Sequence, residues 1–281
     1  MTVGNKKKSI IRLTWSYLIL ILITVCVFYP TLWIIMSSIR PGTSIYSDTL
    51  FPSNPTFEHY KSLFTSEQFK YGLWYWNTLK IATLNMIFGV ILVILTAYAL
   101  SRFRFKGRKN VLSLILILGM FPGFMSMIAV YILLLQLDLL DTHMALIIVY
   151  SAGAPLGAFL VKGFFDTIPK SLEESARIDG ASHWKVFYKI MLPLSKPMLT
   201  YVALITFTGA WVDFIFARLV LRTKENWTLA IGLWDMVQNN AASSFTMFAA
   251  GAVLIAVPIT LLFLFLQRFL VEGLTAGASK G

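Results

Sequence analysis

The sequence ESARIDG occupies residues 174–180, and the sequence IMLP follows at residues 190–193. Polar and charged residues dominate this passage, whereas most of the chain around it is apolar. Ser171 lies three residues before Glu174, which is the spacing of a capping box. In a capping box the serine and glutamate side chains satisfy free backbone N–H groups at the start of a helix. The passage is therefore predicted to begin with an ordered helix.

A sharp turn and a second helix are predicted to follow. Gly180 is placed to end the first helix, since glycine adopts a positive φ without a Cβ clash. Ser182 then caps a second short helix, which Pro193 ends because its ring cannot continue a helix. We therefore predict a helix–turn–helix within residues 165–196. An ordinary connecting loop with chance caps is the alternative, and the rest of the chain must decide between them.

The composition indicates an all-α polytopic membrane protein with a single integral domain. Of the 281 residues, 57% are hydrophobic and only 13% are charged, which is too apolar for a soluble domain of this size. Several apolar stretches reach about 20 residues, the length that crosses a bilayer as a helix. Cys26 is the only cysteine, and the three histidines are isolated, so the sequence predicts neither an internal disulfide nor a metal site.

Six apolar segments are long enough to cross the membrane as helices. The first follows a basic stretch, but it is longer than a signal-peptide core and lacks a cleavage site, so we expect it to remain uncleaved. A cytoplasmic tail of residues 1–15 precedes the membrane domain of residues 16–266, and a second tail of residues 267–281 follows it. The predicted spans are residues 16–38, 77–100, 111–135, 144–164, 197–219 and 244–266.

The distribution of charge predicts the orientation of these spans. Six spans place both termini on one side, and the segments of that side, with Lys162 at the margin of the fourth span, hold 17 of the 24 Lys and Arg residues. Residues 101–109 alone contain five of them. Cytoplasmic loops carry an excess of Lys and Arg, so both termini and the 165–196 loop are predicted to be cytoplasmic. Membrane orientation also accounts for the basic net charge better than a nucleic-acid partner does.

Two of the predicted spans contain residues that interrupt a helix. Pro122 stands between Phe121 and Gly123 in the third span, and Gly153 lies near the middle of the fourth. Interrupted helices occur on the transport paths of membrane transporters. They also occur where small residues let helices pack closely. Both interpretations remain open on the sequence alone.

Asp213 is the one acidic residue placed well inside a predicted span, near the outer end of the fifth. Intramembrane carboxylates are costly, which makes this residue a candidate functional group. A structural ion pair with Arg218 or a polar cap, a substrate contact and a proton-coupling site are the three interpretations. Trp211 and other aromatic residues offer faces on which sugars stack, although contacts with lipid or other helices are commoner. The candidate translocation path comprises Phe121, Pro122, Gly123, Gly153, Trp211 and Asp213.

No catalytic motif is present in the sequence. It has no GxxxxGK[ST] phosphate loop, no Gly-x-Ser-x-Gly and no His-Glu-x-x-His, so the chain is not expected to be an enzyme. A membrane protein with a transport-like core and no such motif would need an external source of energy. Trp184, Phe187, Tyr188 and Met191 follow helical spacing and predict one apolar face suited to a partner's groove. The alternative is that this face packs on the chain's own helix ends or at the lipid interface.

The spacing of Glu174-Ser175-Ala176, Gly180, Ile190 and Leu192-Pro193 resembles the EAA signature of integral membrane subunits of bacterial ATP-binding-cassette (ABC) importers. Ser175 replaces the usual alanine and is small enough for the same contact. The sequence YALSRFRFKG at 98–107 resembles the end of the second span in carbohydrate permeases. WTLAIG at 227–232, PIT at 258–260 and QRFLVEGLTAG at 267–277 resemble the smaller, six-span permease of maltose/maltodextrin importers.

This resemblance implies one subunit of a five-part importer in the bacterial cytoplasmic membrane. A second, homologous permease would complete the path for an oligosaccharide, with maltodextrin expected, and an extracytoplasmic binding protein would deliver the sugar. Two cytoplasmic subunits would bind ATP and Mg²⁺, so this chain would hold no cofactor itself. Another sugar or a polyol, and an ion-coupled secondary transporter, are the alternatives. The implied coupling residues are Glu173, Glu174, Ser175, Ala176, Asp179, Gly180, Ala181, Trp184, Phe187, Ile190, Leu192 and Pro193, and the implied C-terminal contacts are Gly273, Leu274, Thr275 and Gly277.

Overall fold

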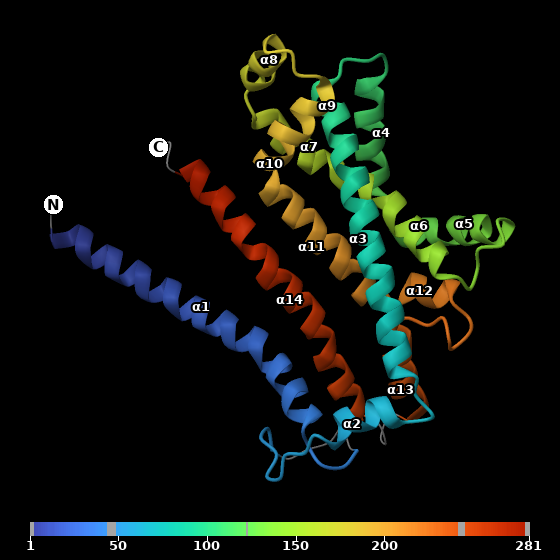
Figure 1. The fold of residues 1–281 in the computed structure, drawn as a ribbon. Coiled ribbons are helices and arrows are strands. Elements are labelled where there is room, and N and C mark those ends of the chain that lie inside the picture. The colour runs from blue at the N-terminus through green and yellow to red at the C-terminus, as the bar shows by residue number, and fades with distance from the viewer. Residues whose placement is uncertain (1–2, 44–48, 122, 241–244, 279–281) are drawn as a thin grey trace. The chain divides into compact units, whose positions relative to one another are not determined.

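The computed structural model describes residues 3–43, 49–121, 123–240 and 245–278 (Figure 1). Within these ranges, residues 3–11, 155–156, 239–240 and 270–278 are described by their backbone alone. Every regular element in the described part of the chain is a helix, which confirms the all-α prediction.

Within the described ranges, three helices are long and apolar enough to cross a membrane unaided. They are α1 (Val3–Ser38), α3 (Tyr71–Arg102) and α14 (Phe245–Ala278), and they include the first and second predicted spans and residues 245–266 of the sixth. All three run past the predicted bounds, and α1 begins 13 residues before the expected start at residue 16. Helix α3 begins six residues before the expected start at residue 77, and α14 continues through much of the predicted C-terminal tail.

The remaining predicted spans are bent or broken. Helices α4 (Arg108–Met120) and α5 (Gly123–Gln136) meet at 103°, and α6 (His143–Gly153) meets α7 (Ala158–Thr167) at 40° across a 3₁₀ turn at Ala154–Gly157. A third pair, His183–Leu194 and Lys196–Val212, is bent by 78°, and if each of the three bent pairs is one span, the total among the described residues reaches six. The predicted fifth span is not continuous, because α11 (Lys196–Val212) ends before the short helix α12 (Ile215–Val220).

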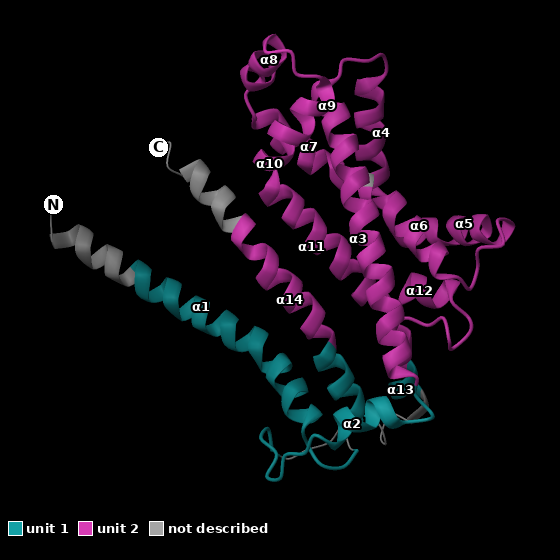
Figure 2. Ribbon diagram, viewed as in Figure 1, with its two compact units in different colours: residues 1–69, 235–254 teal, residues 70–234, 255–281 magenta. Residues whose placement is uncertain are grey.

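The chain forms two compact units (Figure 2). Unit 1 contains residues 1–69 and 235–254, and it includes the short helix α2 (Glu58–Thr65). In this unit the rings of Trp33 and Phe245 pack with 5.3 Å between centroids, and the Thr246 hydroxyl donates a hydrogen bond to the Gly42 carbonyl. Unit 2 contains residues 70–234 and 255–281. The division falls within α13 (Leu229–Asn240) and within α14.

Helix α3 is the central element of unit 2 and packs against α6, α7 and α11. Asn85, which is buried on α3, donates a hydrogen bond of 2.7 Å to the carbonyl of Thr206 on α11. Gly89, one turn further along α3, permits a close approach, since a Cβ there would lie 3.2 Å from the Thr206 side chain. Buried polar groups need such partners, so this contact fixes the register of α3 against α11.

The loop between α5 and α6 is tied to the loop after α12. Asp141 adopts a φ of 60°, and its carboxylate accepts hydrogen bonds from the backbone amides of Arg222 (2.8 Å) and Thr223 (3.0 Å). Burial alone would raise the pKa of Asp141, but these hydrogen bonds outweigh it and hold the pKa below its ordinary value. The ionised carboxylate therefore stabilises the folded state.

Candidate functional site

The 165–196 loop forms a small helical projection at one end of unit 2 (Figure 1). After α7, the chain forms α8 (Lys170–Ile178) and α9 (His183–Val186), then a π-helical turn at Phe187–Met191 and a last turn, α10 (Leu192–Leu194). The C-terminal end of α3 and the start of α4 lie at the same end of the unit. The basic loop between α3 and α4 is therefore a neighbour of this projection.

The predicted capping box at the start of α8 is wrong. The helix begins at Lys170 with Pro169 as its N-cap, and no side chain caps its first turn. Ser171 consequently lies inside the helix, two residues past the N-cap position from which its oxygen would reach the free N–H groups. Proline is well suited to the entrance of a helix because its fixed φ, here −58°, is already close to the helical value.

The predicted turn at Gly180 and the predicted cap at Ser182 are both confirmed. Gly180 has a φ of 80°, and its N–H bonds to the carbonyl of Arg177 at 3.0 Å. The N–H of Ala181 bonds to the carbonyl of Ala176 at 2.9 Å, which completes the Schellman pattern of a helix C-terminus. The Ser182 hydroxyl accepts the N–H of Lys185 and so starts α9.

Pro193 does not end the second helix, contrary to the prediction. The chain stays helical through Leu194 and changes direction only at Ser195. The preceding turn is π-helical, with the N–H of Leu192 bonded to the carbonyl of Phe187. Proline can occupy the first turn of a helical segment without losing a bond that the segment needs, and the wider turn gives its ring room.

Glu173 is the only buried residue of α8, and it pairs with an arginine of the chain itself. Its carboxylate accepts a hydrogen bond from Nε of Arg102 at the end of α3. The side chains of Arg102 and Glu173 are only 3% and 5% exposed. This ion pair is therefore shielded from water and holds α8 on the end of α3.

Further hydrogen bonds extend the ion pair into a network. Arg102 also donates to the carbonyl of Ile168, which lies between α7 and α8, and to the Ser101 hydroxyl, both at 3.0 Å. Ser101 donates in turn to Asp166 on α7, and Asp166 pairs with Lys162 one turn earlier. The end of α3, the end of α7 and the start of α8 are thus joined through one arginine.

The predicted apolar face of the second helix is split. Phe187 and Met191 are buried against α3 and α7, and the rings of Phe187 and Tyr98 lie 4.8 Å apart. Trp184 and Tyr188 are exposed, at 65% and 51%. The interpretation as a face packed on the chain's own helix ends therefore holds for Phe187 and Met191, and only Trp184 and Tyr188 are free to meet a partner.

Beside these residues a small apolar pocket of about 210 Å³ opens between α3 and α9. The ring of Trp184 forms one wall and meets the ring of Phe187 edge-on at 5.5 Å. The ring of Phe103 forms another wall and packs against His183 at 5.4 Å. An exposed tryptophan beside an apolar pocket is a surface feature typical of protein interfaces.

Almost all of α8 and its turn remain exposed. Ile178, at 87%, is the most exposed large apolar side chain of the described residues, and Leu172 is exposed as well. Neither Ile178 nor Arg102 was predicted from the sequence to belong to the site. An apolar side chain as exposed as that of Ile178 is unusual on a protein surface. Of the predicted coupling residues, Glu174, Ser175, Asp179, Gly180, Trp184 and Pro193 are exposed, Ala176, Ala181, Ile190 and Leu192 are half-buried, and Glu173 and Phe187 are buried.

The predicted C-terminal contacts form part of a helix. Residues 273–277, with Gly273, Leu274, Thr275 and Gly277, continue α14, and their side chains lie outside the described residues. The predicted tail is therefore helical in its backbone at these positions.

The candidate path residues are not gathered in one place. Phe121 and Gly123 flank the bend between α4 and α5 and are exposed, and Pro122 lies outside the described residues. Gly153 is exposed at the end of α6. Trp211 is only 1% exposed and packs edge-on against Tyr75, so its ring offers no free face for a sugar.

Asp213 acts as a polar cap in the structure, and the suggested pair with Arg218 is absent. Asp213 ends α11, and its carboxylate accepts hydrogen bonds from the backbone amides of Phe216 (3.2 Å) and Ala217 (3.1 Å) at the start of α12. It also accepts a hydrogen bond from the Tyr150 hydroxyl. Arg218 instead lies over the ring of Trp227, 5.0 Å from its centroid. A carboxylate satisfied in this way is a structural group at a helix break.

The projection carries charged and apolar groups but no cluster suited to catalysis or metal binding. No group of three or more His, Cys, Asp or Glu residues able to hold a metal ion occurs among the described residues. The arrangement is a rigidly anchored surface of about two short helices, which suits contact with another protein.

Comparison with known proteins places the chain among transport proteins. Residues 89–275 match the family described as binding-protein-dependent transport system inner membrane component. The galactooligosaccharides transport system permease protein GanQ of Bacillus subtilis (strain 168) is 45% identical over the full length of both chains. The maltodextrin transport system permease protein MdxG of the same strain is 41% identical over 95% of each chain, and the maltose/maltodextrin transport system permease protein MalG of Escherichia coli (strain K12) is 37% identical over 100% of each.

The fold also matches that of a solved transporter. A chain from the crystal structure of a bacterial ABC transporter involved in the import of the acidic polysaccharide alginate superposes with a TM-score of 0.79 at 23% identity. The match covers 95% of this chain and 98% of that one.

Proposed function

The chain belongs to the family of binding-protein-dependent transport system inner membrane components, and we propose that it is one permease subunit of an ATP-driven oligosaccharide importer. The observation that carries the proposal is the likeness of the whole chain to permeases named for galactooligosaccharides and maltodextrin. A second, homologous permease completes the translocation path, and an extracytoplasmic binding protein delivers the sugar. Both termini and the α8 projection face the cytoplasm, in agreement with the distribution of basic residues.

The α8 projection is the element on which the ATPase subunits dock. This docking role is supported by the burial pattern of α8. Glu173 is the one buried residue of the helix, whereas Ile178 at its end is highly exposed. ATP and Mg²⁺ are held by those subunits, and this chain supplies the surface that they move. When nucleotide draws the ATPases together, a projection fixed to α3 and α7 moves as a rigid body and shifts the path between its two access states. Coupling requires different docking energies in the two states.

Two further contacts belong to this proposal. The helical end of α14 around residues 273–277 reaches the ATPase subunits, and the predicted loops at residues 39–76 and 220–243 face the binding protein. The support for the loops is that the charge distribution assigns them to the outer side, and the support for α14 is its resemblance to the maltodextrin permeases at residues 267–277.

The docking proposal is tested by reversing one exposed charge on α8. Glu174→Lys should weaken co-purification of the ATPase subunits and uncouple ATP hydrolysis from sugar uptake, while the variant still inserts and stays monodisperse. Glu67→Lys is the matched control, because Glu67 is also exposed but is assigned to the opposite side of the membrane. The docking surface would be refuted if Glu174→Lys and Ile178→Asn, each measured in parallel with the native chain, both retained native co-purification of the ATPase subunits and native sugar uptake.

The substrate is tested by uptake in a strain that lacks this chain. Two sugars compete, because the relatives of 45% and 41% identity are named for galactooligosaccharides and for maltodextrin. Restoring the chain should restore uptake of one of these labelled oligosaccharides, with trehalose as the negative control. If neither oligosaccharide requires the chain, the oligosaccharide assignment is wrong, whatever the outcome for the docking surface.

A further inference from the structure

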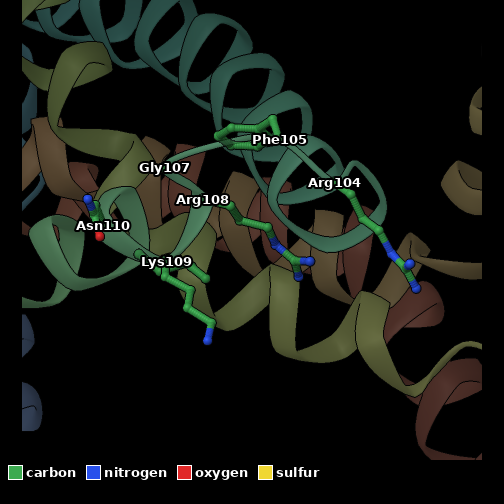
Figure 3. Close-up of a pocket in the computed structure, with 7 residues that line it drawn as sticks. Arg104, Phe105, Gly107, Arg108, Lys109 and Asn110 are labelled. Atoms are coloured by element: carbon green, nitrogen blue, oxygen red, sulfur yellow. The ribbon is translucent and has the colours of Figure 1, made fainter.

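The loop between α3 and α4 forms a basic pocket that the transport function does not use. The pocket has a volume of about 680 Å³ and is lined by Arg104, Phe105, Gly107, Arg108, Lys109, Asn110 and Leu112 (Figure 3). Arg104 and Arg108 extend their guanidinium groups to the same side of the loop. We propose that this pocket binds the phosphodiester headgroup of an anionic phospholipid.

The positive charges of the pocket have no acidic partner in the part of the chain that the structure describes. Among the described residues, Arg104, Arg108 and Lys109 form no ion pair with an acidic side chain. The Nε atom of Arg108 is buried and lacks a hydrogen-bond partner in the same part of the chain. Arg102 and Lys162, at the same end of unit 2, are both paired with carboxylates. Grouped cations without a counter-charge favour an anionic occupant.

The start of α4 adds the backbone N–H groups of Lys109 and Asn110 to these charges, whereas the N–H of Arg108 is bonded to the carbonyl of Phe105 at 3.3 Å. Gly107 is the N-cap with a φ of 89°, no side chain caps the first turn, and that turn contains no acidic residue. The first N–H groups of a helix point outward and carry a partial positive charge, which suits a phosphate oxygen. The helix is 13 residues long, so its dipole is fully developed at this end.

The apolar part of the site identifies a lipid as the source of the phosphate. Phe105 and Leu112 line the pocket beside the cations. Helix α4 then continues with no buried residue, and its side chains at Leu114 and Ile117 are 54% and 52% exposed. Leu114 and Ile117 lie in the predicted third span, so acyl chains run beside the pocket, where a phospholipid can reach both the cations and the apolar surface. A phospholipid places its headgroup on the cations and its acyl chains along α4.

Native mass spectrometry of the full-length chain, purified with its partner subunits in mild detergent, tests the site. The probe is phosphatidylglycerol, titrated against phosphatidylcholine as the zwitterionic reference. The triple variant Arg104→Gln, Arg108→Gln, Lys109→Gln should lose about fivefold in affinity per cation, or roughly a hundredfold in all. The single variant Arg108→Gln should lose about fivefold, and it keeps the test open if the triple variant does not assemble.

Two variants separate the site from general charge and from misfolding. The triple variant at Lys6, Lys7 and Lys8, each changed to Gln, removes the same charge from the same predicted side and should keep its affinity within about threefold. Arg104→Lys with Arg108→Lys retains the charge and should also bind. An equal loss in the lysine-tail control, or in the charge-conserving variant, would overturn the site.

The remaining outcomes distinguish other occupants of the pocket. Crosslinking of a photoreactive phosphatidylglycerol to residues 103–112 supports the proposal, and its absence from that peptide contradicts it. Displacement of the lipid by millimolar inorganic phosphate would assign the pocket to a soluble anion instead. Loss of the ATPase subunits from the triple variant with lipid affinity unchanged would assign it to a protein interface and overturn the lipid site.

Discussion

Removal of the Glu173 carboxylate is expected to destabilise the permease by about 3–5 kcal/mol, because it leaves a buried arginine without its counter-charge. The structure sets this magnitude through burial, since the side chains of Arg102 and Glu173 are 3% and 5% exposed. In the Glu173→Ala variant the guanidinium keeps its hydrogen bonds to the Ile168 carbonyl and the Ser101 hydroxyl. Neither group carries a negative charge, so the cost of burying the cation is no longer offset.

A double-mutant cycle measures the interaction directly. Arg102→Ala should cost about as much as Glu173→Ala, and the double variant should cost little more than either, which gives a coupling energy of about 3 kcal/mol. Unfolding is followed in mixed micelles by tryptophan fluorescence during a titration with sodium dodecyl sulfate, using the eight tryptophans of the chain.

The control is the neighbouring pair of Lys162 and Asp166. These residues are also in contact, at 2.5 Å, but their side chains are 15% and 42% exposed and lie one helical turn apart. Lys162→Met should cost no more than about 0.5 kcal/mol. A coupling energy between Arg102 and Glu173 below about 1 kcal/mol would contradict the predicted effect of burial on this ion pair, because that is the range of an exposed pair.

Three further changes test other parts of the fold. Gly180→Ala should cost about 1–2 kcal/mol, since alanine is strained at a φ of 80°. Gly232→Ala should lower the free energy of unfolding by about 3 kcal/mol, because its Cβ would lie 2.0 Å from the Trp74 ring. Gly153→Ala has no atom within 4 Å of the new Cβ and should change the free energy of unfolding by no more than about 0.5 kcal/mol. The pKa of Asp141 is lowered on folding, so its carboxylate stabilises the folded state at pH values above the unfolded pKa of about 4. This stabilisation is lost as the pH falls through the folded pKa. Asp141→Asn should therefore remove this part of the pH dependence of the free energy of unfolding.

Each of these expectations has a result that contradicts it in the same unfolding assay. Native stability in Gly180→Ala would mean that the turn relaxes out of the left-handed region. Equal costs for Gly232→Ala and Gly153→Ala would contradict the close contact with Trp74. An unchanged stability difference between native protein and Asp141→Asn from pH 6 to pH 3 would show that the aspartate does not titrate with folding.

The class of fold follows from the sequence because long apolar segments admit few alternatives. Length and apolarity alone predict membrane helices, and the spacing of Gly180 and Ser182 predicts a turn and a cap whose geometry is local. The start of α8 was predicted wrongly for a local reason as well. Pro169 and Ser171 both suit a helix entrance, and the sequence does not state which of them the chain uses.

The contacts that anchor the projection were beyond sequence reasoning. Arg102 and Glu173 are 71 residues apart. Arg102 lies in a basic run that the positive-inside rule fully explains, so nothing in the sequence marks it as the one cation that folds inward. The π-helical turn at Phe187–Met191 has no residue signature either. It turns Phe187 and Met191 toward the core and leaves Trp184 and Tyr188 outside.

The single buried anchor of α8 has a consequence for how this protein can diverge. Eight of the nine residues of the helix are not buried, so substitutions there leave the core of the permease untouched. Under the docking that we propose for α8, recognition of a partner and stability of the fold are encoded by separate residues, joined only at Glu173. A permease built in this way can exchange one ATPase for another through surface substitutions alone. Grafting the exposed residues of α8 from a relative, with Glu173 retained, should transfer partner choice at little cost in stability.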